Sequence, residues 1–354
     1  MSELAVIAGV ALIATVLVDM GLTVLHPTIR GPLSHRLTRL VWRLARAVAR
    51  VSGRRVVLEF AGPLVTVSLL ATWIVGLWLG FGLVLVASIG HFSSSVHLGH
   101  SGLLAALYSS ATDLTTLGIG DLLPASAGAR TVVAAEAVAG VATVSAAISY
   151  VLSVYPLATQ TRAYALLLSD LGLRTPEGAL AYLRAAGDSG LADVHERLIN
   201  GHQSLRRLSV LYYFDTGRDR ESVGRMLETA SVLCAIARWA PPRELTTYGH
   251  HVARGLQATL RRIRRDYEGR YIGGETGTTN FSETGEAAAR DQLNTLRRLA
   301  RREGAQPPDH HEARAFAEFV QDMDELLDGY ARSHLMDHRP LAERLAPAAH
   351  PAEP

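Results

Sequence analysis

The segment from Thr115 to Asp121 holds the residues whose types and spacing could do chemistry most directly. It reads Thr-Thr-Leu-Gly-Ile-Gly-Asp, so glycine stands at every second position, at 118 and 120. Glycine enters the left-handed backbone region without steric cost, and this freedom lets successive carbonyls point toward one axis. Rings of carbonyl oxygens can replace the water that a cation loses in a narrow passage. The segment therefore predicts a strip of main-chain oxygens that binds dehydrated cations.

Three apolar segments and one shorter run must position this strip. A helix-compatible run from Gly102 to Thr115 comes directly before it, Val57 to Ile89 and Thr131 to Tyr155 flank the whole, and Leu4 to Leu25 precedes them. A bilayer core about 30 Å thick needs roughly 20 apolar residues in a helix, and each apolar segment is long enough. We expect three spanning helices, with the strip in a re-entrant loop that is too short and polar to span.

The sequence around the strip resembles the tetrameric potassium channel family, in particular its bacterial members with a single pore loop. The resemblance covers about residues 57–156 and is most specific from Ala106 to Pro124. Gly140 follows Gly120 by twenty residues, where family members often carry a hinge glycine. The family implies a homotetramer that conducts potassium passively through stacked rings of backbone carbonyls.

The resemblance assigns ion binding to the strip, which would act as the selectivity filter. Two residues depart from the family pattern: Ile119 stands where an aromatic is usual, and Leu117 where valine is usual. Loss of the aromatic cuff could loosen discrimination against sodium, so a weakly selective cation channel stays an alternative. A membrane sensor or scaffold with a vestigial pore is another. Potassium would lie at Thr116, Leu117, Gly118 and Ile119, and the filter set is Thr116, Leu117, Gly118, Ile119, Gly120 and Asp121.

Residues after the filter predict a cavity and a gate. Gly140 and the positions one helical turn apart after it form a stripe, which lines the cavity or packs on neighbouring helices or lipid. Bending at Gly140 would widen the inner mouth, and Leu152 could close it. Glu136 is a costly charge at membrane depth. We expect it to bond polar groups behind the filter, such as Ser110, Thr112 or Asp113, or to concentrate cations in the vestibule. The gating and cavity candidates are Glu136, Gly140, Val141, Val144, Ile148 and Leu152.

The distribution of arginine predicts the orientation. Eight arginines lie between the first and second apolar segments, whereas none occurs from Val56 through Ala129. Short loops rich in arginine stay on the cytoplasmic side. We therefore expect a multi-pass protein of the cell inner (plasma) membrane, with its N-terminus outside and its C-terminal domain in the cytoplasm.

The arginine-rich linker, residues 30–56, predicts an amphipathic helix. Its arginines recur at three and four residues, and leucines and valines occupy the other face. Such a helix lies along the inner leaflet with its guanidinium groups on anionic lipid headgroups, as an anchor or as a lever on the pore. Asp19, near the end of the first apolar segment, is expected to pair with these arginines. The lipid-binding candidates are Arg36, Arg39, Arg43, Arg46 and Arg50.

The region 158–340 predicts a helical cytoplasmic domain of five or six helices. Thr175 followed by Pro176 is a helix start, because threonine caps a helix and proline suits its first turn. A glycine fingerprint after a strand is missing, as are protease and metalloprotease signatures, so we expect no enzyme and no cofactor besides potassium ions. Its ligand or protein partner stays open. Apolar residues recur at helical spacing over Leu191–Phe214, Arg220–Trp239, Leu245–Tyr271, Glu283–Glu303 and Glu312–Met336.

Composition bounds the remaining possibilities. All 35 basic residues are arginine, and 33 acidic residues nearly cancel them to a net charge of +2, which does not favour nucleic acid as a partner. Cys234 is the single cysteine, so no intrachain disulfide is possible. The pairs His250-His251 and His310-His311 are expected at the surface, because adjacent residues of a helix point in different directions.

The expected fold is an all-α membrane protein. It combines a potassium-channel-type pore, made of two helices and a re-entrant loop, with an extra N-terminal transmembrane helix and a helical cytoplasmic domain. The expected domains are a first transmembrane helix (1–29), the basic linker (30–56), the pore domain (57–157), the cytoplasmic domain (158–340) and a disordered tail (341–354).

Overall fold

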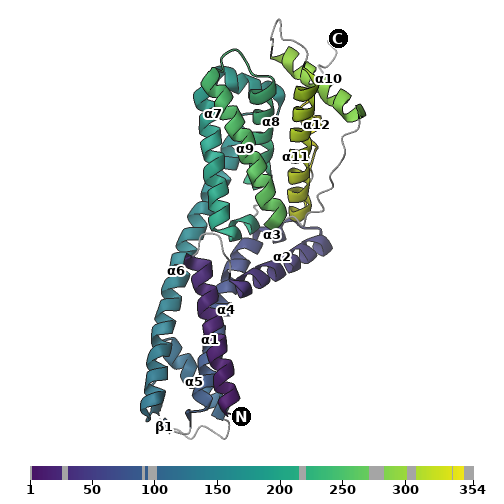
Figure 1. The fold of residues 1–354 in the computed structure, drawn as a ribbon. Coiled ribbons are helices and arrows are strands. Elements are labelled where there is room, and N and C mark those ends of the chain that lie inside the picture. The colour runs from purple at the N-terminus through teal and green to yellow at the C-terminus, as the bar shows by residue number, and fades with distance from the viewer. Residues whose placement is uncertain are drawn as a thin grey trace. The chain divides into compact units, whose positions relative to one another are not determined.

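The protein is described by a computed structural model in which nearly every element is a helix (Figure 1). The residues described form two compact units. The first holds residues up to Val48, Phe60–Leu157 and Arg206–Phe214, and the second holds Ala49–Glu59, Ala158–Leu205 and the chain from Asp215. The prediction of an all-α membrane protein is confirmed. The described residues are 2–25, 31–89, 92–94, 102–214, 221–270, 283–300, 308–336 and 338–346.

Three helices are long and apolar enough to cross a membrane: α1 (Ser2–Leu25), α4 (Ala61–Val86) and α6 (Ala127–Asp170). They match the three segments expected from hydropathy. The last is longer than predicted, because the helix does not end near Tyr155 but continues through Pro156. Proline removes one helical hydrogen bond without necessarily ending a long helix. The predicted boundary after residue 157 therefore separates the two units but lies inside one helix.

Helices α1 and α4 lie side by side and approach closely at glycines (Figure 1). A Cβ atom on Gly9 would lie 2.6 Å from the carbonyl oxygen of Gly80, and one on Gly76 would lie 2.6 Å from Cγ2 of Val16. Small residues four positions apart let membrane helices pack at short distance, where dispersion replaces the hydrophobic effect as the main attraction. Gly76 and Gly80 thus allow α1 to pack closely against α4.

Asp19 of α1 is fully buried and holds the start of α2 (Pro32–Ser52). Its carboxylate accepts hydrogen bonds from the backbone N–H groups of Leu33, at 2.8 Å, and Ser34, at 3.1 Å, and from the indole of Trp73, at 3.1 Å. The first N–H groups of a helix have no partner within it, so a carboxylate satisfies them and suits the helix dipole. The expected pairing of Asp19 with the linker arginines is therefore wrong for the contacts that the structure describes.

Residues 206–214 belong to the first unit, although they were predicted as part of the cytoplasmic domain. The predicted helix to Phe214 ends at Arg207, and a short 3₁₀ helix, η2 (Ser209–Tyr213), follows. A Cβ atom on Gly62 would lie 2.5 Å from the Phe214 ring, whose centroid is 5.7 Å from that of Tyr155. Burial of large aromatic surface explains the placement of this segment, which helical periodicity could not reveal.

The second unit is a helical assembly around α8, whose residues are nearly all buried. Thr175 caps the first of its helices as predicted, because its hydroxyl accepts from the Gly178 N–H at 3.2 Å. That helix is kinked at Gly187, where φ is 55° and ψ is −145°. The helices are α7 (Pro176–Arg207), α8 (Val223–Trp239), α9 (Thr247–Arg270), α10 (Glu283–Leu299), α11 (His310–His334) and α12 (Leu341–Arg344), and α3 (Val56–Glu59) lies earlier in the chain.

The tail from residue 341 is not disordered over its first six residues. They include α12, and the side chains of Leu341 and Leu345 are fully buried. These two leucines, four residues apart, bury apolar surface that the Pro/Ala-rich composition of the tail concealed. The prediction of disorder is wrong for residues 341–346, and the rest of the tail lies outside the described residues.

Candidate ion-conduction site

A short helix and a pair of strands hold the two ends of the candidate filter. The helix α5 (Gly102–Leu114) comes directly before it, as predicted. The strand β2 (Leu122–Pro124) comes directly after it and pairs antiparallel with β1 (Phe92–Ser94), with Ser93 opposite Leu123. The sequence analysis did not predict these strands, because each is only three residues long. Both ends of the strip are therefore held by secondary structure.

The backbone of the strip alternates in handedness. Thr116, Gly118 and Gly120 have φ angles of 56°, 52° and 79°, and among the described residues Leu117 and Ile119 are not in this region. The alternation predicted from the two glycines therefore extends one step further, to a threonine for which the left-handed conformation is strained. Alternating right- and left-handed residues direct successive N–H groups to one side and the carbonyls to the other.

The N–H side of the strip faces α5. Leu117 and Gly118 both donate from their backbone N–H groups to the Thr112 carbonyl, at 2.9 and 3.3 Å, and Thr116 donates to the Asp113 carbonyl at 3.0 Å. These carbonyls belong to the last turn of α5 and have no partner within the helix. The carbonyl side of the strip is consequently directed away from α5.

The strip is uncovered within one chain. Every residue from Thr115 to Gly120 is exposed, and the side chains of Leu117 and Ile119 are 68% and 55% exposed. A Cβ atom on Gly118 would meet no atom within 4 Å. Polar backbone at membrane depth is tolerated only where protein buries it or where it lines a water-filled cavity. The surface of the strip is therefore incomplete in a single chain.

Helix α5 is anchored to α4 by polar contacts with its backbone and side chains. The indole of Trp78 donates to the Leu107 carbonyl at 2.8 Å, and the Ser110 hydroxyl lies 2.9 Å from the Trp78 carbonyl. A Cβ atom on Gly82 would lie 2.6 Å from Cδ2 of Leu107, so glycine at this position leaves room for the Leu107 side chain. These contacts fix the helix that carries the strip.

Glu136 of α6 completes this anchor. It is fully buried and hydrogen-bonds the Ser110 hydroxyl, as expected. Its second oxygen, Oε2, is buried with no hydrogen-bond partner among the described residues. The alternative that Glu136 concentrates cations in an open vestibule is contradicted, because a fully buried side chain does not line one. Glu136 acts on the position of α5.

Gly140 lies against the end of α5 and not on the exposed stripe of α6. A Cβ atom there would lie 1.9 Å from the carbonyl oxygen of Leu114, directly before the strip. Its assignment to the cavity lining is therefore wrong, and close helix approach explains why glycine is needed. The other predicted residues of the stripe are exposed in the single chain: Val141 (56%), Val144 (54%), Ile148 (55%) and Leu152 (68%).

Asp121, the last predicted filter residue, is linked to α5 by its side chain. The Tyr108 hydroxyl donates a hydrogen bond to its carboxylate. This contact braces the end of the strip, next to Gly120 with its left-handed backbone. Asp121 therefore has a positioning role in the structure, and its part in ion binding stays a prediction.

Helix α2 is amphipathic, as predicted for the linker. It has a buried face, a face of exposed arginines and an exposed apolar face. Trp42 is buried and contacts the rings of Tyr212 and Tyr213 edge-on, at 6.4 and 5.1 Å between centroids. Arg46 is half-buried and so departs from the other lipid-binding candidates, Arg36, Arg39, Arg43 and Arg50, which are exposed. An exposed apolar stripe lies beside them, formed by Leu40 (54%), Leu44 (58%) and Val48 (53%).

Three spanning-length helices, a short helix and a left-handed strip together define a membrane protein with an ion channel domain. The family model described as "Ion channel" matches residues 73–155, which contain α5, the strip and most of α6. The resemblance to potassium channels that the motif suggested is confirmed over this segment.

One curated relative extends the comparison beyond the channel segment. The chain is 25% identical over 230 residues to the "Uncharacterized membrane protein YdjJ" of Bacillus subtilis (strain 168). The match covers 63% of this chain and 66% of that protein, slightly less than two thirds of its length. No solved structure matches the chain.

Several residues of the site escaped the sequence analysis. Thr116 gave no sign of a left-handed backbone, since that conformation is uncommon outside glycine. Trp78 did carry a signal, because a buried indole N–H needs an acceptor, but its partner on α5 could not be read from the sequence. Gly82 carried no spacing signal, because the residues four positions away, Trp78 and Val86, are not small.

Proposed function

We propose that the protein is a passive potassium-selective channel that conducts through backbone-carbonyl rings of the Thr116–Asp121 filter. The proposal rests on the alternation of left-handed residues at Thr116, Gly118 and Gly120. The backbone N–H groups of Thr116, Leu117 and Gly118 donate to carbonyls of α5. Carbonyls presented on the opposite side replace the hydration shell of an ion. Conduction requires no enzymatic step and no cofactor besides the permeating potassium ions.

The proposal includes a homotetramer. One chain supplies one strip, and its exposed carbonyl side is costly next to lipid, so copies must enclose it around a water-filled axis. The exposed stripe of Val141, Val144, Ile148 and Leu152 on α6 would then line the inner cavity or pack on a neighbouring copy. Gating by bending at Gly140 and closing at Leu152 belongs to the same proposal.

A weakly selective cation channel is the second candidate. Ile119 stands where the family carries an aromatic, and its side chain is 55% exposed in the single chain. Selectivity depends on how firmly the carbonyls are held, and an aliphatic residue offers less edge contact than an aromatic ring. The Tyr108–Asp121 hydrogen bond favours the potassium-selective reading, because it braces the strip from the side of α5.

We also propose that α2 lies along the inner leaflet of the cell membrane, with the N-terminus outside and the second unit in the cytoplasm. Its exposed apolar stripe suits the acyl boundary, and the exposed guanidinium groups of Arg36, Arg39, Arg43 and Arg50 suit anionic headgroups. An arginine-rich connection between α1 and α4 supports this orientation.

Reversal potentials in planar bilayers test the function. Purified protein should pass a current that follows the potassium gradient and ignores an opposing sodium gradient. Gly118→Ala, at a φ of 52°, should abolish the current, because alanine at a left-handed position is strained by roughly 1–2 kcal/mol in each copy. Gly128→Ala is the matched control, since a Cβ atom there meets nothing within 4 Å.

The outcomes separate the candidates. A current that follows both gradients equally would support the weakly selective channel. No current from well-folded protein, or a current that survives Gly118→Ala unchanged, would contradict conduction through the strip and favour the sensor or scaffold.

A further inference from the structure

A pocket with several charged residues in its lining lies in the second unit, where α7 begins. Its volume is about 510 Å³, and its charged lining consists of Arg174, Arg339 and Arg344 with Glu177 and Glu343. Small-molecule sites in proteins have volumes of this order. All of these residues belong to the second unit, so the pocket is a feature of one compact body.

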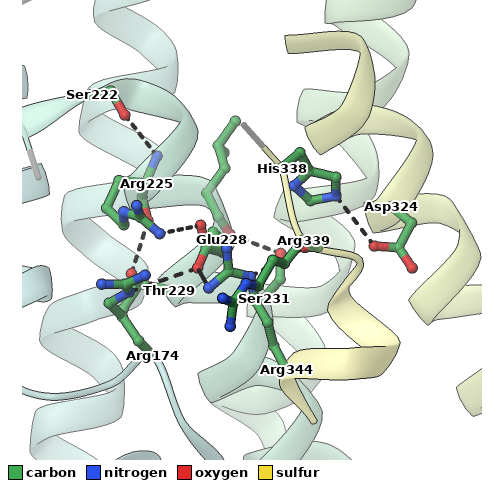
Figure 2. A network of polar contacts seen from close by, with 11 residues as sticks. Arg174, Ser222, Arg225, Glu228, Thr229, Ser231, Asp324, His338, Arg339 and Arg344 are labelled. Atoms are coloured by element: carbon green, nitrogen blue, oxygen red, sulfur yellow. Dashed lines mark hydrogen bonds and ion pairs between the residues drawn. The ribbon is translucent and has the colours of Figure 1, made fainter. Parts of the chain in front are cut away.

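Three guanidinium groups beside the pocket converge on one carboxylate (Figure 2). Glu228 of α8 accepts a hydrogen bond from Arg225 at 2.6 Å, and its other carboxylate oxygen forms ion pairs with Arg344 at 2.5 Å and with Arg174 at 3.8 Å. The side chains of Glu228, Arg225 and Arg344 are only 7%, 10% and 11% exposed. One buried negative charge is thus shared by three positive charges.

The charged residues around the pocket carry more positive than negative charge, because Arg174, Arg225, Arg339 and Arg344 outnumber Glu177, Glu228 and Glu343. Arg225 Nε is buried with no hydrogen-bond partner among the described residues. Burial lowers the pKa of Arg344; Glu228 opposes this effect, and the charges of Arg225, Arg174 and Arg339 add to it. Buried charges that are incompletely paired are costly to a fold. An anion in the pocket would offset the excess positive charge of the arginines that line it, Arg174, Arg339 and Arg344.

We propose that this pocket binds a small phosphorylated metabolite that carries hydroxyl groups, such as a nucleotide or a sugar phosphate. The planar fork of arginine matches a phosphate group, and Arg174, Arg339 and Arg344 all line this pocket. Glu177 and Glu343 disfavour a simple polyanion but accept hydrogen bonds from ligand hydroxyls. The ligand must therefore combine a phosphate end and a hydroxyl-bearing end.

The helix dipole at the mouth of the pocket supports the phosphate end. Thr175, which caps α7, lines the pocket, and the first N–H groups of a helix attract anions. Gly172 and Arg174 lie in the turn that follows α6 directly, and α6 carries the exposed stripe of the channel domain. Resting on the proposed channel function, we infer that the ligand changes the open probability of the pore through this turn.

Binding is tested by titration calorimetry on the full chain in neutral detergent, with AMP and inorganic pyrophosphate as probes. AMP should bind saturably and more tightly than pyrophosphate. Arg339→Gln and Arg174→Gln should each weaken AMP binding by about tenfold, the effect of one lost charge-assisted hydrogen bond. The control is Arg314→Gln on α11, whose side chain is 69% exposed, and it should leave binding unchanged.

Further arms identify the source of the phosphate and the consequence of binding. A short-chain phosphatidylglycerol that binds in place of AMP would show a lipid headgroup as the occupant and overturn the metabolite assignment. Absence of saturable AMP binding, or equal affinity in the Arg339→Gln, Arg174→Gln and Arg314→Gln proteins, would overturn the site. AMP binding without any current would leave the site standing and refute the channel, whereas an unaltered current on binding would refute the regulatory link alone.

Discussion

The two units stabilise buried carboxylates in opposite ways. In the first unit, Asp19 is held by backbone N–H groups and an indole, and Glu136 by a serine hydroxyl. In the second unit, Glu228 is held by arginines, and Arg264 pairs with Glu268 at 2.7 Å and with carboxylates of α11. Between the apolar helices of the first unit, neutral hydrogen-bond donors and a helix N-terminus stabilise these carboxylates without the burial of a second charge. In the second unit, by contrast, carboxylates are stabilised by ion pairs with arginines.

Among the substitutions that test this contrast between the units, Glu228→Gln should have the largest effect on stability. The substitution removes the carboxylate that pairs with Arg174, Arg225 and Arg344, and breaking a buried ion pair costs about 3–5 kcal/mol. Chemical denaturation of the full chain should show the second unit unfolding at lower denaturant concentration. Added AMP should restore part of the loss, whereas unaltered unfolding would mean that the arginines do not depend on Glu228.

Gly140→Ala should produce the next largest effect, in the first unit. The new methyl group would lie 1.9 Å from the Leu114 carbonyl, and overpacking of this kind costs about 1–3 kcal/mol. Because the carbonyl immediately precedes the strip, we expect bilayer currents to be lost or to become permeable to sodium. Gly128→Ala is again the control. A Gly140→Ala protein with normal selectivity and altered opening alone would favour the hinge over the close contact.

Glu136→Gln should have a smaller effect than Glu136→Ala. The amide keeps a partner for Ser110 and buries no charge, so the stability of the first unit should change by less than about 1 kcal/mol. Alanine removes the partner and leaves a cavity, with an expected loss of about 1–3 kcal/mol. Thermal unfolding in detergent measures both. If glutamine were as damaging as alanine, the carboxylate charge itself would be required and the contrast between the units would fail.

The smallest effect concerns pH and the second unit. Burial lowers the pKa of His195, while a contact with the Gly255 backbone partly opposes the shift. The unfolded chain therefore binds a proton at higher pH than the folded chain, and stability falls as the pH drops below about 6.5. Melting temperatures from pH 8 to pH 5 should decline less steeply in His195→Gln than in the unchanged protein. Parallel curves would show that His195 does not contribute.

The sequence predicted best those features that depend on local backbone chemistry or long apolar runs. The left-handed glycines 118 and 120, the three long helices and the cap at Thr175 all follow from such local rules. A polar partner for Glu136 was expected because a charge at membrane depth needs one, and the structure selects Ser110 from three candidates, with Thr112 and Asp113 as the others.

Features that depend on contacts between distant segments were predicted poorly. The approach of Gly140 to Leu114, the return of residues 206–214 to the first unit and the capping of α2 by Asp19 each join parts of the chain that periodicity treats separately. The pairing of Arg174 and Arg344 with Glu228 was missed for the same reason, since both arginines are remote from Glu228 in sequence.

The most direct test of the central claim is an electron cryo-microscopy or crystallographic structure of the full chain in thallium or rubidium salts. We predict four copies around one axis, with ions in line and coordinated by the carbonyl oxygens of Thr116, Leu117, Gly118 and Ile119. Strips that lie apart without a shared axis, or an axis without bound ions, would contradict the account.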